Sequence, residues 1–151
     1  KEAITQFSGD GRAYYRRGGK RKVLTVPPDI KDTLTAIYAI RALPLEVGET
    51  YRVPLLDGDD VETLVVPVRR RTAMAGRRVL AVYPYTVEAG TAEQKDQWAL
   101  FLTDDQRRIP VRMKLALAFG KLHLRLTDVR TEPGGGDPRV MFCDESVRMP
   151  R

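Results

Sequence analysis

Residues 98–119 read WALFLTDDQRRIPVRMKLALAF and hold the clearest strand pattern in the chain. An apolar segment at 98–103 is followed by the turn-forming residues DDQR at 104–107. From 108 to 119 apolar side chains fall at every second position, while Arg108, Arg112 and Lys114 lie on the other side. Such alternation is typical of a strand with one face on the core and one toward solvent. The stretch therefore predicts two antiparallel strands joined by a charged turn.

Similar segments on both sides of this pair extend the pattern. Strands are predicted at residues 3–7, 12–16, 21–26, 50–56, 61–71, 78–85 and 121–126, with glycine-containing turns such as Asp57-Gly58 between them. Residues 87–96 are polar and are predicted to form a loop, and residues 131–151 contain PGGG and read as a linker and tail. The fold class is therefore mainly β, with an antiparallel curled sheet, barrel-like or sandwich, in a single domain over residues 1–130.

One helix is predicted at residues 30–43. Leu34, Ile37, Ile40 and Leu43 recur at helical spacing, Asp29 or Asp32 can cap the first turn, and Pro44 ends the helix. We expect the apolar face to pack on the sheet. An open, lipid-facing helix is the alternative.

The composition limits the classes of function. With 42% hydrophobic and 30% charged residues the chain is globular, and no apolar run approaches the ~20 residues that span a bilayer. The net charge of +6 comes from short basic clusters, and without evidence that these share one face with aromatic residues nucleic-acid binding is not favoured. The single cysteine, Cys143, excludes an internal disulfide. With His123 as the single histidine, the sequence indicates neither a metal site nor a cofactor. The chain begins with Lys1, which indicates a trimmed or processed piece.

Three stretches together resemble the bacterial exported proteins grouped as domain of unknown function 3108. They are DTLTAIYAIRALPLEVG at 32–48, the Asp57-Gly58 hairpin with the strands that follow it, and WALFLTDDQRRIPVR at 98–112, with Gly120 closing the next strand. The resemblance covers about residues 4–130. It implies an antiparallel β architecture, no assigned activity, and a periplasmic or outer-membrane-associated location in a Gram-negative bacterium. It also implies that further strands precede Lys1, so that a partner chain or the missing segment covers an open sheet edge.

The charged turn is the first candidate site. Asp104, Asp105, Arg107, Arg108 and Pro110 could carry acid–base chemistry, because paired carboxylates do so when their pKa values are pushed apart. Adjacent aspartates in a turn more often shape the turn and pair with arginine. We therefore expect a structural turn motif and no catalytic residue.

A binding surface is the second candidate site. The ligand- or partner-binding candidates are Trp98, Met113, Tyr38, Arg41, Ile37 and Tyr83. We expect Trp98, Met113 and the helix face to share the concave side of the sheet, with Tyr38 and Arg41 available to clamp an anionic head group.

These observations predict a non-enzymatic envelope module that binds an apolar or lipid-like ligand or a protein partner. The alternatives are a structural subunit of an envelope assembly and a hydrolase that acts on envelope polymer.

Overall fold

The computed structural model describes residues 3–88, 90–117, 120–130 and 139–144. The elements in the first half of the chain are β1 (Ala3–Ser8), β2 (Arg12–Arg17), β3 (Lys20–Thr25), α1 (Thr33–Ala42), β4 (Thr50–Asp57) and β5 (Asp60–Met74). Those in the second half are β6 (Arg77–Val82), β7 (Tyr85–Glu88), β8 (Gln94–Gln97), β9 (Ala99–Thr103), β10 (Pro110–Leu117), β11 (Gly120–Arg130) and β12 (Arg139–Asp144).

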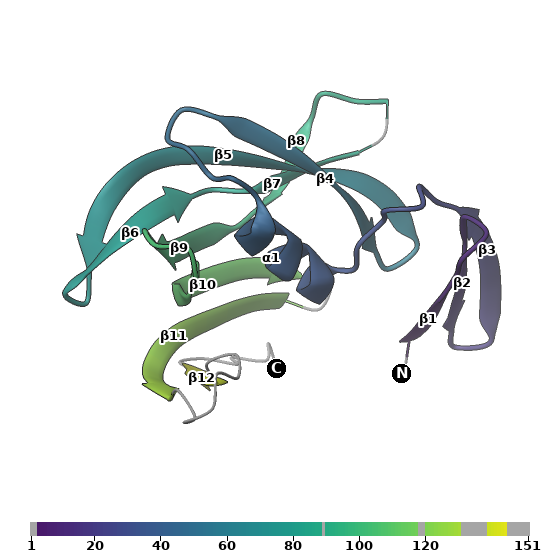
Figure 1. The fold of residues 1–151 in the computed structure, drawn as a ribbon. Coiled ribbons are helices and arrows are strands. Elements are labelled where there is room, and N and C mark those ends of the chain that lie inside the picture. Colours follow the sequence, from purple (N-terminus) through teal and green to yellow (C-terminus); the bar gives the residue numbers. More distant parts are fainter. Residues whose placement is uncertain (1–2, 89, 118–119, 131–138, 145–151) are drawn as a thin grey trace.

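The strands form two antiparallel sheets (Figure 1). The small sheet has the order β1-β2-β3, and the large one has the order β12-β11-β10-β9-β6-β5-β7-β8, with β4 paired to β5. The large sheet curls around α1, and its outermost described strands, β12 and β8, are not paired with each other (Figure 1). The prediction of a mainly β, antiparallel, curled fold with one helix is therefore confirmed, and the described strands form an open sheet.

The long strand β5 is the spine of the large sheet. Its first half pairs with β4 on one side and, through residues 62–65, with β7 on the other. Its second half pairs with β6 after a register shift between Val68 and Arg70. Such an irregularity raises the local twist, and this is where β5 passes from one set of partners to the other.

Helix α1 begins three residues later than the sequence pattern predicts. Residues before it are extended: the Lys31 N–H donates to the Pro54 carbonyl, and the Lys31 carbonyl accepts from the Leu56 N–H. Asp32 is the N-cap, with Oδ1 accepting from the Thr35 N–H at 2.7 Å. Of the two predicted caps, Asp29 and Asp32, Asp32 is the one that caps the helix.

The buried face of α1 is formed by Ala36, Ile37 and Ile40. Leu34, which the sequence pattern places on the buried face, is exposed instead. It shares its side of the helix with Tyr38, four residues later, and that side points to solvent.

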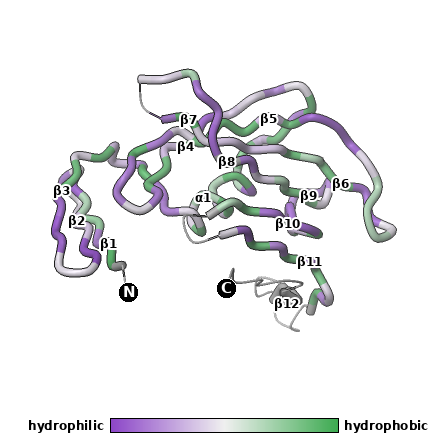
Figure 2. Tube along the Cα trace, turned by 180° about the vertical axis from the view of Figure 1, so that it is seen from behind, coloured by the Kyte–Doolittle hydropathy of each residue, from purple (hydrophilic) through white to green (hydrophobic). Residues whose placement is uncertain are grey.

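The main core lies between α1 and the concave side of the large sheet. It joins the helix face to alternate residues of several strands, among them Leu64, Leu80, Leu100 and Leu102. Hydrophobic and hydrophilic residues alternate along β10 and β11 (Figure 2). From Val111 to Leu115 buried and exposed side chains alternate as predicted, with Met113 and Leu115 in the core beneath the helix, whereas Phe119 lies outside the described residues.

The small sheet packs on the rest of the molecule through a second, smaller hydrophobic cluster. Ala13 and Val26 are buried against Leu56, which lies at the end of β4, with Leu24 and Ile30 packed around them. Since side chains alternate along a strand, Tyr14 and Arg16 on β2 point to the opposite side from Ala13. The small sheet thus has an inner face on the body of the protein and an outer face away from it.

Two segments predicted to lack regular structure form strands. The first, within 87–96, contributes to β7 and to β8, which are joined through a turn containing Gly90 at φ +83°. The second, residues 139–144 of the predicted tail, forms β12 on β11. In both cases a neighbouring strand supplies the hydrogen bonds, so the local sequence needs no strand pattern of its own. The PGGG segment lies outside the described residues.

Candidate functional site

The charged turn between β9 and β10 is organised by Asp105. Its Oδ1 accepts hydrogen bonds from the Thr103 hydroxyl at 2.8 Å and from the N–H groups of Arg107 and Arg108 at 3.0 and 3.2 Å. Its Oδ2 accepts from the Arg107 guanidinium at 3.1 Å. Burial raises the pKa of Asp105, but the hydrogen bonds from Thr103 and Arg107 outweigh it and hold the pKa below its usual range. Asp105 is therefore an ionised turn former.

The Asp104 carboxylate pairs with three arginines, one from its own turn and two from the neighbouring β5–β6 hairpin. Its carboxylate lies 2.9 Å from Arg71 Nε, 3.6 Å from Arg78 Nη2 and 3.4 Å from Arg108 Nη1. Arg71 and Arg78 belong to the β5–β6 hairpin, so the carboxylate ties that hairpin to the β9–β10 turn. The predicted Arg–Asp pairing within the turn is present between Arg107 and Asp105, whereas the pairs that link Asp104 to the β5–β6 hairpin were not predicted.

Arg108 is part of the turn and stabilises it through its guanidinium. The sequence pattern places Arg108 on the wet face of the long strand, but its φ of +47° puts it in the turn, and β10 begins at the buried Pro110. A left-handed arginine is strained. Its guanidinium reaches the carbonyls of Thr103 and Leu45, both at 3.4 Å, which holds this conformation.

Arg41 fastens the helix to the same turn. Its Nε and Nη2 donate to the carbonyls of Arg108 and Arg107 at 3.0 and 3.1 Å, and its guanidinium carbon lies 5.6 Å from the centre of the Tyr38 ring. The structure thus brings Tyr38, Arg41 and the turn together. Because two of its donor groups already bind backbone, Arg41 acts here as a structural connector.

The remaining candidates do not form an open surface. Trp98, Met113 and Ile37 do meet on the concave side, but they are only 3%, 4% and 7% exposed. The Trp98 indole N–H donates to the Ala116 carbonyl at 3.1 Å, as expected of a core tryptophan. The half-buried Tyr83 packs edge-on against Phe101, with ring centres 6.0 Å apart. The concave side that the sequence reasoning offered as a binding surface is therefore filled by the helix and closed.

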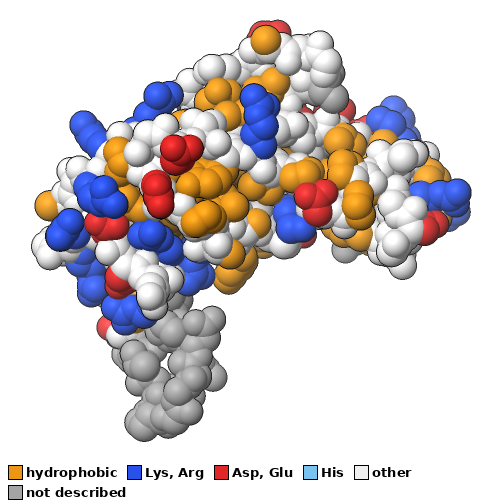
Figure 3. Space-filling view, turned by 45° about the horizontal axis from the view of Figure 1, so that its top comes forward, with side chains coloured by type: hydrophobic (Ala, Val, Ile, Leu, Met, Phe, Trp, Pro, Cys, Tyr) orange, Lys and Arg blue, Asp and Glu red, His pale blue; other side chains and the backbone are white. Residues whose placement is uncertain are grey.

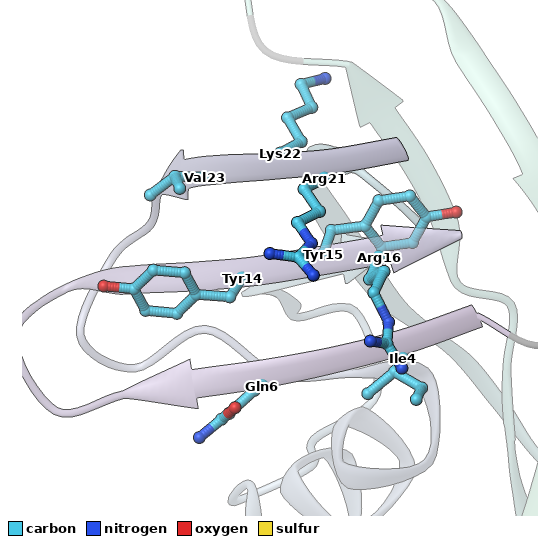
Figure 4. Close-up of a pocket in the computed structure, with 8 residues that line it drawn as sticks. All are labelled: Ile4, Gln6, Tyr14, Tyr15, Arg16, Arg21, Lys22 and Val23. Atoms are coloured by element: carbon cyan, nitrogen blue, oxygen red, sulfur yellow. The ribbon is translucent and has the colours of Figure 1, made fainter. Parts of the chain in front are cut away.

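The outer face of the small sheet is the surface that the sequence reasoning missed. It carries Ile4, Tyr14 and Val23, which are 41%, 42% and 61% exposed, together with Arg16 and Arg21. These five residues help to line an open hollow of about 460 Å³ (Figure 4). At the right end of Figure 3, hydrophobic and basic side chains lie next to one another over β1–β3.

A signal for this face was present in the sequence. The pairs Tyr14-Tyr15 and Arg16-Arg17 follow each other on one strand, and alternation sends one member of each pair to either side. Tyr15 is buried toward the body, so Tyr14 is left outside. Which tyrosine would be outside depended on the position of the main body, and strand periodicity does not contain that information.

The other chemically active residue types do not form a site in the described part of the chain. No three His, Cys, Asp or Glu side chains among the described residues group closely enough to hold a metal ion. His123 is half-buried on β11, and Cys143 belongs to β12, where only the backbone is described. No helix in the same part of the chain is long and apolar enough to cross a membrane.

Comparison with known proteins finds a family whose function is unknown. A family model described as a protein of unknown function, DUF3108, matches residues 1–127. No curated protein and no solved structure matches the chain. The match covers both sheets up to β11 and includes the helix and the charged turn. The chain belongs to the DUF3108 family.

Proposed function

We propose that this chain is a non-enzymatic binding module of the bacterial cell envelope, which binds a lipid-like, amphipathic ligand on the outer face of β1–β3. The observation that carries the proposal is the group of exposed apolar side chains, Ile4, Tyr14 and Val23, around an open hollow on a sheet that projects from the body (Figures 1 and 4). Exposed apolar groups beside polar ones are typical of binding surfaces. The resemblance to exported proteins supports an envelope location.

The chemistry of the charged turn supports a module without catalysis. Asp104 and Asp105 are held by arginines, a threonine hydroxyl and backbone N–H groups, and the pKa of Asp105 is lowered. A general acid needs the opposite shift, toward neutrality. These carboxylates are thus suited to holding the turn, and an envelope-polymer hydrolase would need a different site.

Native mass spectrometry after incubation with a bacterial lipid extract tests the proposal. The wild-type chain should retain a lipid adduct, and Tyr14→Ser combined with Val23→Ser should lose it. Leu34→Ser is the matched control, because Leu34 is an exposed hydrophobic residue on α1, away from the small sheet. Absence of an adduct on the wild type, or its loss in Leu34→Ser as well, would refute the proposal.

A structural subunit is the second candidate, and strand β1 favours it. Among the described strands β1 pairs only with β2, so its other edge offers free backbone groups next to the exposed Ile4 and Phe7. Sheet edges of this kind accept strands from other chains. Analytical ultracentrifugation decides: a monomer at all accessible concentrations would exclude self-assembly through this edge.

A further inference from the structure

The small sheet carries most of the chain's net positive charge. Residues 3–26 contain six basic side chains and one carboxylate, a net charge of +5, whereas the whole chain has +6. The basic residues are Arg12, Arg16, Arg17, Lys20, Arg21 and Lys22, and the carboxylate is Asp10. The excess charge of the protein is therefore concentrated on one projecting element.

Two of these cations are placed directly opposite each other on the outer face. Arg16 of β2 and Arg21 of β3 are register partners, and in Figure 4 Arg21 reaches across β2 while Arg16 extends toward Ile4. Like charges at opposed positions repel each other. Within the described part of the chain neither guanidinium forms an ion pair, and an anion bound between them would relieve the repulsion.

The apolar residues stand beside this pair in the neighbouring row of the sheet. Gln6, Tyr14 and Val23 lie opposite one another across the three strands, and Ile4, Arg16 and Arg21 form the adjacent row. A tyrosine and aliphatic side chains next to arginines make the combination that sits at a bilayer interface, where the rings and aliphatic groups enter the head-group region and the arginines bind phosphates. The hollow is open and borne by a projecting sheet, so an extended surface can reach it.

We propose that the outer face of β1–β3 docks on the phosphate-bearing surface of an anionic phospholipid bilayer, with Arg16 and Arg21 binding lipid phosphates and Tyr14, Val23 and Ile4 entering the interface. The inference rests on the proposed function in using the same face, and adds the class of ligand and its charge. Binding at this surface is electrostatic in part, so it weakens as salt is raised.

Vesicle co-sedimentation of the whole chain tests the inference. The probes are vesicles of phosphatidylglycerol with phosphatidylethanolamine, and vesicles of phosphatidylcholine alone. Each basic residue near an anionic bilayer contributes about a five-fold factor to binding, so Arg16→Gln with Arg21→Gln should weaken binding to the anionic vesicles about thirty-fold. The matched control is Arg69→Gln with Arg70→Gln, which removes the same charge from exposed positions of β5 and should change binding less than three-fold.

The apolar half of the face is tested separately. Tyr14→Ser with Val23→Ser should weaken binding to anionic vesicles as well, while circular dichroism shows the same fold for all variants. Equal binding of the wild type to neutral and anionic vesicles, or an equal effect of the two arginine pairs, would overturn the inference. So would binding to single-stranded DNA or polyglutamate as tight as to anionic vesicles, because charge alone would then explain the result.

The two proposals fail in different ways. A lipid adduct that depends on Tyr14 and Val23, with no preference for anionic vesicles, would leave the proposed function standing and remove this inference. A preference for anionic vesicles that depends on Arg16 and Arg21 supports the membrane-docking inference, even if native mass spectrometry detects no lipid adduct.

Discussion

Removing the Asp104 carboxylate should destabilise the protein by breaking the connection between the β5–β6 hairpin and the β9–β10 turn. The Asp104 and Arg108 side chains are only 13% and 18% exposed and 3.4 Å apart, and a charge-assisted hydrogen bond in such a place contributes about 1.5–3 kcal/mol. Arg71 and Arg78 are 52% and 80% exposed, and such pairs contribute about 0.2–1 kcal/mol each. Asp104→Asn should therefore lower the free energy of unfolding by about 2.5 kcal/mol.

Denaturation followed by Trp98 fluorescence measures this effect. Trp98 is the sole tryptophan and is buried in the main core, so its emission reports exposure of that core. For a chain of this size each kcal/mol shifts Tm by about 2–4 °C, so a fall of about 5–10 °C is expected. High salt should weaken the contributions of Arg71 and Arg78, whose side chains are exposed, and should leave the contribution of Arg108 largely unchanged.

Double-mutant cycles compare Arg108 and Arg78, the least and the most exposed of the three arginines. The coupling of Asp104→Asn with Arg108→Met should be about 1.5 kcal/mol, and the coupling with Arg78→Met below about 0.5 kcal/mol, because the second pair is far more exposed. Equal couplings, or a cost of Asp104→Asn below about 1 kcal/mol, would show that the carboxylate does not connect these segments.

Three further perturbations probe the turn, the helix and the core. The pKa of Asp105 is lower in the folded protein than its ordinary value of 3.8, so the ionised carboxylate stabilises the fold above pH 3.8, and this stabilisation is lost as the pH falls further. In urea titrations at a series of pH values, Asp105→Asn should therefore reduce the loss of stability at acid pH. Ile40→Ala should cost about 2–5 kcal/mol by leaving a cavity, whereas Leu34→Ala should cost less than about 0.5 kcal/mol in the same titrations, since Leu34 is 67% exposed; similar costs would mean that the helix packs through its other side. Trp98→Phe should cost about 1–3 kcal/mol, as it leaves the partly buried Ala116 carbonyl without the indole donor, and calorimetry showing no change in Tm would contradict that role.

The strands with strong local patterns could be predicted from the sequence, and those without could not. β9 and β10 follow from alternation and from a turn rich in aspartate and arginine. β8 and β12 have no such pattern. Each is an edge strand that pairs with the strand preceding it in the chain, β7 for β8 and β11 for β12, and this neighbour supplies its hydrogen bonds. Local periodicity does not carry that information.

The candidate site shows the same division. The role of Asp104 and Asp105 in the turn was predictable, because adjacent aspartates favour turns. That Arg41 would fasten to the carbonyls of Arg107 and Arg108 was not, since the two segments are more than sixty residues apart and meet only in the folded chain. Ile37 and Ile40 were correctly predicted to face the sheet and Leu34 was not. The helix covers the concave side, so these residues form core, and the exposed apolar residues of the small sheet lie on the outer face of β1–β3.

Strand β5 has a consequence for the way the large sheet comes apart. Its first half pairs with β4 and β7, and its second half pairs with β6. β5 therefore passes unbroken from one wing of the sheet, formed by β4, β7 and β8, to the other wing, which runs from β6 through β9, β10 and β11 to β12. A line drawn between the two wings must cross this strand and cannot follow a boundary between neighbouring strands. The nine strands therefore have no seam along which one wing could melt while the other persisted, and the large sheet is built to be lost in a single cooperative step.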